Sequence, residues 1–172
     1  MKYIRREVGK LISYANAMNI KVFFSKPNKH TSGDWTTDWT TITIYEDKPI
    51  WQYFTIIHEL AHHRQWLADG KKVPLKTDQA FYKYNNIEDD SKLDKASRKL
   101  VYEAEKRDSV HQLTIHYETQ SKVPLSWLKA EISLDIWVYL CYYKTGRYPS
   151  MKEKKEKRKE LRLKYGQNKK RK

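Results

Sequence analysis

Residues 47–70 read DKPIWQYFTIIHELAHHRQWLADG, and this stretch decides the fold prediction. Asp47 is a suitable N-cap, and Pro49 suits the first turn of a helix because its missing N–H would have no helical partner there. Gly70 suits the position just past a helix end, where a left-handed backbone is common. No residue between Pro49 and Gly70 is a strong helix breaker, so we expect a helix from residue 49 to about residue 68.

The flanking sequence supplies the other elements. The expected helices have apolar residues at helical spacing, and the expected strands are short runs of β-branched and aromatic residues. Residues 25–34, between the two strands, are turn-rich. The expected helices are residues 3–18, a short turn at 79–84, 92–117 and 127–144; the expected strands are 20–24 and 39–45 (WTTITIY). Ser91 and Ser126 are the expected N-caps of the last two helices, and Gly146 is the expected end of the last one. This order predicts an α+β fold that is mainly helical, with a small antiparallel sheet.

Composition and charge limit the class of protein. The chain has 172 residues and a formal net charge of +14, and residues 151–172 hold 12 Lys and Arg against 3 Glu. We therefore expect one domain over residues 1–150, followed by a basic tail, helical or disordered, over residues 151–172. No apolar run is long enough for a membrane span or a signal peptide, and a single cysteine, Cys141, fits a reducing, cytoplasmic setting with no membrane partner.

The segment His58-Glu59-Leu60-Ala61-His62 is an HExxH motif. Positions four apart lie on one helical face, so both imidazoles can bind one tetrahedral zinc ion. At about 100° per residue, Glu59 lies beside the metal direction rather than along it. Its carboxylate could then take a proton from a zinc-bound water without binding the zinc. The motif predicts a zinc-dependent peptidase with one zinc ion per chain and a peptide or protein substrate.

A catalytic zinc site needs a third protein ligand. In residues 101–118, VYEAEKRDSVHQLTIHYE, the candidate ligands are the carboxylates of Glu103, Glu105 and Asp108, with His111 and His116 as nitrogen alternatives. Glu105 and Asp108 are three apart and share a helical face, which suits one carboxylate on the metal and the other on a histidine's far N–H. Glu103 points about 200° away from Glu105, so only one of them can serve. We favour Glu105 and keep Glu103 and a histidine as alternatives.

The order of a strand, a helix with HExxH and a later helix with a glutamate resembles the gluzincin peptidases. The chain resembles small HExxH peptidases of phage and prophage genomes and, distantly, the ImmA/IrrE type, in which the later glutamate ligand often lies in an E-x-x-[AD] context that Glu105-Lys106-Arg107-Asp108 matches. The resemblance implies a zincin-like fold in a bacterial or phage-infected cell. It also implies that His58, His62 and Glu105 bind zinc, that Glu59 is the catalytic base, and that the 39–45 strand is an edge strand beside the active-site helix which pairs with an extended substrate.

Two other groups of HExxH peptidases match the sequence less well. The metzincin extension is absent, because Gln65 and Ala68 stand where its glycine and third histidine would be. Proteases of the SprT-like class use a third histidine and act on protein crosslinked to DNA, and in such a reading His111 or His116 would be the ligand. The alternative function is accordingly a non-catalytic or SprT-like zincin module that binds nucleic acid through its basic tail.

Two further sets of residues are candidates. Zincins often stabilise the oxyanion with a Tyr, His or Arg from another segment. The candidates for an oxyanion or substrate contact are His111, His116, Tyr139, Tyr142 and Tyr143. Phosphate contacts by the tail would use its lysine and arginine side chains. The candidates for nonspecific nucleic-acid binding are Lys154, Lys155, Lys157, Arg158 and Lys159.

Overall fold

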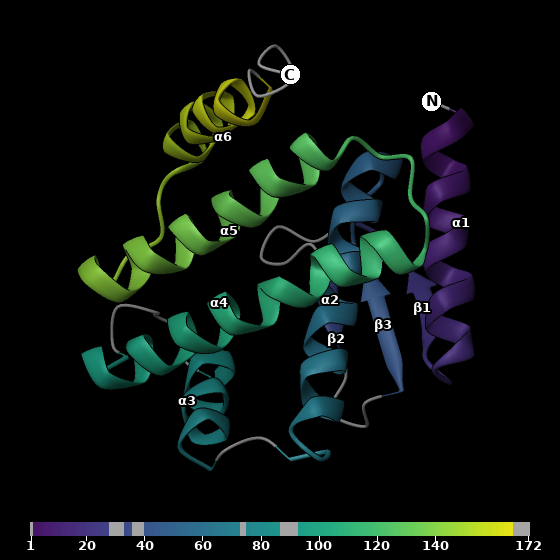
Figure 1. Ribbon diagram of the computed structural model, residues 1–172. Coiled ribbons are helices and arrows are strands. Elements are labelled where there is room, and N and C mark those ends of the chain that lie inside the picture. Colours follow the sequence, from purple (N-terminus) through teal and green to yellow (C-terminus); the bar gives the residue numbers. More distant parts are fainter. Residues whose placement is uncertain (1, 28–32, 36–39, 73–74, 87–92, 167–172) are drawn as a thin grey trace. The chain divides into compact units, whose positions relative to one another are not determined.

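The computed structural model describes residues 2–27, 33–35, 40–72, 75–86 and 93–166 (Figure 1). The chain is mostly helical and carries one small sheet. In chain order the elements are α1 (Lys2–Ala17), β1 (Lys21–Phe24), β2 (Gly33–Trp35), β3 (Thr41–Ile44), α2 (Pro49–Ala68), α3 (Leu75–Asn86), α4 (Lys95–Glu118), α5 (Leu125–Thr145) and α6 (Met151–Gly166). They form two compact units, Met1–Ala68 with Val110–Val123 and Asp69–Ser109 with Pro124–Lys172. None of the described helices is both long and apolar enough to cross a membrane.

The first unit is built around α2. Tyr53, Ile56, Ile57 and Leu60 of α2 are fully buried, and α2 contacts α1, β2 and β3. The helix begins at Pro49 and ends at Ala68, and Gly70 beyond it has a φ of 69°. The helix predicted from the caps of residues 47–70 is therefore confirmed, and it carries the HExxH motif through the middle of this unit.

The sheet is mixed, in the order β1-β3-β2. β1 and β3 pair in parallel, with Val22 opposite Ile42, whereas β2 and β3 pair antiparallel, with Gly33 opposite Ile44. The expected antiparallel sheet is wrong for the β1–β3 pair. The reason is the extra strand β2, which lies in a stretch expected to be a turn. Because the chain reverses into β2 and reverses again before β3, β3 runs in the direction of β1.

The expectation that residues 39–45 form an edge strand is also wrong. β3 occupies Thr41–Ile44 and is the central strand, with a neighbour on each side. The edge strand in contact with α2 is β2. A strand of three residues that starts with glycine has almost no hydrophobic alternation, so its sequence resembles a turn.

The second unit contains α3, the first part of α4, α5 and α6. Ala130 and Leu134 of α5 enclose Leu161 of α6 in a small apolar cluster. Glu131 of α5 is buried, and its carboxylate accepts hydrogen bonds from Arg158 Nε at 2.9 Å and Arg162 Nη2 at 3.0 Å. Residues 151–166 of the predicted tail are thus a helix that packs on α5, and residues 167–172 lie outside the described residues.

The caps of two helices differ from those expected from the sequence. Asp94 caps α4, because its carboxylate accepts the Ser97 N–H and the Ser97 hydroxyl, each at 2.8 Å. Ser91, the expected cap, lies outside the described residues. α5 starts after Pro124, and no side chain caps it, so Ser126 is not its cap. Gly146 does end α5, with a φ of 73° and an N–H that donates to the Tyr142 carbonyl. α3, expected as a single turn, has 12 residues.

Candidate metal centre

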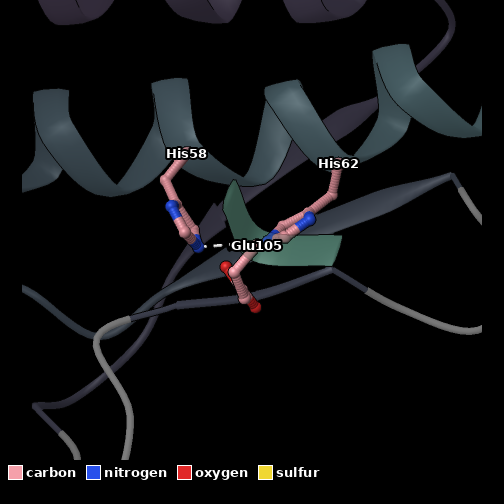
Figure 2. A group of neighbouring side chains, drawn as sticks. All are labelled: His58, His62 and Glu105. Atoms are coloured by element: carbon pink, nitrogen blue, oxygen red, sulfur yellow. Dashed lines mark hydrogen bonds between the residues drawn. The ribbon is translucent and has the colours of Figure 1, made fainter. Parts of the chain in front are cut away.

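His58 and His62 project from one face of α2, as the four-residue spacing predicts (Figure 2). Their Nε2 atoms are 3.1 Å apart, and their rings are nearly perpendicular, with an interplanar angle of 89°. Two imidazole nitrogens this close together can bind one ion, since zinc–nitrogen bonds are about 2.0–2.1 Å long. The helix therefore presents two of the ligands that a zinc site requires.

The environment of His58 favours the form that binds metal. Burial, together with the neighbouring His62, lowers the pKa of His58 to about 3. The imidazole is therefore neutral at physiological pH. A neutral imidazole keeps a ring nitrogen lone pair for a metal, whereas an imidazolium has none.

Gln112 of α4 contacts the other ring nitrogen of His58. Its amide Nε2 lies 3.3 Å from His58 Nδ1, and the glutamine is buried, with 3% of its surface exposed. Metal-binding histidines commonly use their second ring nitrogen for a fixed hydrogen bond that sets the ring orientation. Gln112 occupies that place for His58. Gln112 was not among the predicted site residues, although it follows Glu105 by seven residues and so shares its helical face.

Glu59 is buried between α2 and β2, with 8% of its surface exposed. A Cβ atom on Gly33 would lie 3.2 Å from Glu59 Oε1 and only 2.3 Å from Thr55 Cγ2. Only glycine allows the β2 backbone this close to α2. Glycine at this position thus lets an edge strand reach the carboxylate of Glu59, and no sequence pattern around Gly33 predicts this contact.

Glu105 supplies the third potential ligand. Among the described residues, His58, His62 and Glu105 form a group whose ligand atoms all lie within 4.8 Å of one another, and Figure 2 shows the three side chains converging. Glu105 is 7% exposed. The rival carboxylate, Glu103, has a 55% exposed side chain, and its Oε1 lies 3.6 Å from Lys99 Nζ. Two imidazoles and one carboxylate that converge in this way could hold a metal ion.

Glu105 has acidic and phenolic neighbours in the second unit. Burial, together with the nearby carboxylates of Glu131 and Glu105, raises the pKa of Asp135 to about 8. Burial and the same Glu105 raise the pKa of Tyr139 well above its usual value. Asp135 and Tyr139 are four residues apart on α5 and share one face, so both side chains lie near Glu105. Asp135 was not among the predicted site residues, because only the packing of α5 brings it there.

The remaining histidine candidates have other partners. His111 Nε2 lies 2.9 Å from Gln65 Oε1. His116 is buried, and its Nδ1 lies 2.9 Å from the Tyr53 hydroxyl. Burial raises the pKa of Tyr53 to about 12, so this hydroxyl keeps its proton and can donate a hydrogen bond to His116. Neither histidine belongs to the described group that could hold a metal, and the third-histidine reading therefore lacks support from their positions.

The structure also describes contacts of Asp108 and Tyr143. Asp108 is buried, and its Oδ1 accepts a hydrogen bond from Arg107 Nε at 3.2 Å. Tyr143 stacks on Tyr102 with ring centroids 5.8 Å apart, and its carbonyl accepts a hydrogen bond from Arg98. Of the tyrosines considered for the oxyanion, Tyr139 is the one whose surroundings include Glu105.

The five basic residues predicted to bind nucleic acid divide into two sets. Arg158 holds the buried Glu131, Lys157 donates to Glu160 at 2.8 Å, and Lys154 lies 5.7 Å from the centre of the Tyr148 ring. Lys155 and Lys159 are exposed on α6. Arg158 thus helps to hold α6 on α5, and Lys154 and Lys157 are half-buried, so Lys155 and Lys159 are the members of the five that are most available to a polyanion.

The group on α2 and α4 thus carries the donor types of a metal site, with a buried carboxylate, Glu59, next to it in the sequence. Comparison of the chain with protein-family models, with curated protein sequences and with solved structures finds no match.

Proposed function

We propose that the protein is a zinc-dependent peptidase in which His58, His62 and Glu105 hold the metal and Glu59 is the general base. The observation that carries this proposal is the convergence of three ligand atoms within 4.8 Å. Two imidazoles and one carboxylate leave a fourth tetrahedral position for water, the arrangement that distinguishes catalytic zinc sites from structural ones. The nitrogen and oxygen donors, with no thiolate, also fit zinc better than a soft-metal site.

The roles of the chain's own groups follow from their positions. A bound zinc ion would polarise the scissile carbonyl and lower the pKa of a water molecule. Glu59 is one residue from His58 on the helix, so its carboxylate can accept the proton of the attacking water and return it to the leaving amine. Its burial against β2 fixes the carboxylate in place. The Tyr139 hydroxyl, which keeps its proton, is our candidate for the donor that stabilises the oxyanion.

We propose that an extended peptide substrate pairs with the edge of the sheet at β2. β2 is an edge strand of the described sheet, it contacts α2, and its Gly33 lies against Glu59. An extended peptide that added to this edge would be held by backbone hydrogen bonds, and its scissile bond would lie next to α2. This proposal replaces the 39–45 strand, whose two edges are both occupied.

Metal content tests the site. Mass spectrometry of the purified, zinc-supplied protein should find about one zinc per chain, as expected for a three-ligand site. His58→Ala and Glu105→Ala should lose it or bind it much more weakly. Glu103→Ala is the matched control, because it removes an exposed carboxylate of the same helix and should keep the zinc. Zinc loss in His58→Ala but not in Glu105→Ala would refute Glu105 as the ligand, and no zinc in the wild type would refute the whole proposal.

Turnover tests the mechanism. Glu59→Gln should bind zinc normally and lose hydrolysis of a quenched fluorescent peptide library by about 10²–10⁴-fold, the usual contribution of a general base. Wild-type turnover in a Glu59→Gln protein with full zinc content would exclude Glu59 as the base.

A further inference from the structure

The outer edge of β1 offers backbone hydrogen-bonding groups to another chain. The Lys21 N–H donates to the Thr40 carbonyl at 2.8 Å, and the Ser25 N–H donates to the Ile44 carbonyl at 2.9 Å. Successive residues of a strand direct these groups to opposite sides. Val22 and Phe24 therefore direct their N–H and C=O groups away from β3. In the described part of the sheet, no strand pairs with this side of β1.

The same strand exposes large aromatic side chains. Phe23 is 53% exposed and Phe24 is 48% exposed, although both belong to a strand of a packed sheet. The register places Phe23 beside Thr43 on one face and Phe24 beside Ile44 on the other. Proteins usually protect edge strands with charges, proline or a cover, because an apolar edge pairs readily with other chains. β1 has only Lys21 at one end and Lys26 just beyond the other.

The surroundings of this edge are strongly basic. Residues 2–27 contain six Lys and Arg and a single acidic residue, Glu7. Glu7 is 1% exposed, and its carboxylate accepts hydrogen bonds from Lys10 Nζ and the Lys122 N–H, so it offers no negative charge to a partner. α1 contacts β1 and carries Lys2, Arg5 and Arg6 as exposed residues. A second copy of the chain would bring like charges together, whereas an acidic partner would be attracted.

We propose that the outer edge of β1 binds an extended segment of a partner protein in which acidic residues flank a short apolar run. The segment would add a strand to the sheet through the outward groups of Val22 and Phe24. Its apolar side chains would cover Phe23 and Phe24, and its carboxylates would meet Lys21 and Lys26. This edge is opposite β2 in the sheet, so the proposal does not depend on the metal centre or on peptidase activity.

Selection from a displayed library of random seven-residue peptides tests the surface on the full chain. The wild type should enrich peptides that contain Asp or Glu around β-branched or aromatic residues. Val22→Pro removes one outward N–H but no hydrogen bond to β3, so it should lose at least tenfold in affinity for the enriched peptides while thermal stability and zinc content stay unchanged. Lys21→Glu with Lys26→Glu should lose a similar factor and, because both residues are exposed, should fold normally.

Backbone amide exchange supplies a readout that does not rely on Val22→Pro folding. Binding of an enriched peptide should slow exchange of the Val22 and Phe24 amides, while the Phe23 amide, which faces β3, should change little. Enriched peptides without acidic residues, or the same affinity in both variants, would overturn the proposal. Concentration-dependent dimerisation that is lost with Val22→Pro would also overturn it, in favour of pairing between two copies of the chain.

Discussion

Gln112 Nε2 lies 3.3 Å from His58 Nδ1, the ring nitrogen that does not face His62. A metal on His58 Nε2 requires the proton on Nδ1, and that N–H then needs an acceptor. The amide of Gln112 can supply one by turning its oxygen toward the ring, an exchange of two nearly isosteric ends. Gln112 can therefore hold the imidazole in its metal-binding tautomer.

Replacement of Gln112 should weaken metal binding without removing a ligand. We expect Gln112→Leu to lower zinc affinity by about 10–100-fold, the usual effect of losing a partner of a metal-bound histidine. Gln112→Glu keeps an acceptor of similar size and should retain most of the affinity. Competition with a fluorescent chelator measures both values. Equal affinities in the wild type and Gln112→Leu would show that Gln112 does not orient His58.

Gly33→Ala should destabilise the first unit. Its new Cβ would lie 2.3 Å from Thr55 Cγ2, so β2 or α2 must shift. Overpacking of this kind costs about 1–3 kcal/mol in the free energy of unfolding, and the shift should also lower turnover because Glu59 lies at the same contact. Chemical denaturation and peptide hydrolysis measure the two effects.

Two variants check the cause of that loss. Thr55→Ser deletes the clashing methyl group, so Gly33→Ala with Thr55→Ser should recover much of the stability. Gly9→Ala on α1 meets nothing within 4 Å, and in a helix interior it should stabilise the protein by about 0.5–1 kcal/mol. A Gly33→Ala protein as stable as the wild type would contradict the close approach.

Asp135 should make stability fall as pH rises. Burial raises its pKa to about 8, whereas an unfolded aspartate has a pKa of about 3.9. Between these values the folded state holds a proton that the unfolded state releases, so the free energy of unfolding decreases from about pH 4 to pH 8. Asp135→Asn removes this pH dependence of the free energy of unfolding and should raise the melting temperature more at pH 8 than at pH 5. Thermal unfolding scans at both pH values, with a chelator present, measure this difference. Asp47→Asn, which changes an exposed aspartate, is the control and should show no such pH dependence.

The basic residues of α6 should separate into structural and available groups. Arg158→Gln removes one of two partners of the buried Glu131 and should lower the melting temperature. Lys155→Gln with Lys159→Gln changes exposed side chains and should leave stability within about 0.5 kcal/mol, while weakening low-salt binding to a DNA duplex. Unchanged DNA binding in the lysine variant would place any polyanion site elsewhere.

The sequence predicted the grouping of His58, His62 and Glu105 better than it predicted the sheet. HExxH spacing is local, so the helix geometry alone brings His58 and His62 together. Glu105 could be chosen over Glu103 because the two point in opposite directions around α4, and the exposed Glu103 side chain agrees with that choice. Periodicity and caps likewise located α2 and the end of α5 at Gly146.

The features that the sequence did not predict depend on contacts between segments that are distant in the chain. β2 has three residues and becomes a strand only because β3 and α2 hold it. Without β2, two strands joined by a turn predict an antiparallel pair, and the parallel β1–β3 pairing follows only once β2 is known. Gln112 and Asp135 were missed for the same reason, because their roles come from the packing of α4 on α2 and from the face that α5 presents within its unit.

The central position of β3 has a consequence for aggregation. Residues 40–45, TTITIY, contain no charge and no proline, and five of the six are β-branched. Segments of this composition form cross-β stacks when their backbone N–H and C=O groups are not paired within the protein. β1 covers one side of this strand and β2 covers the other. Since β2 has only three residues, local opening at Gly33–Trp35 would uncover the segment of this sheet best suited to fibril formation. We therefore expect the short strand that approaches Glu59 also to limit self-association of the chain.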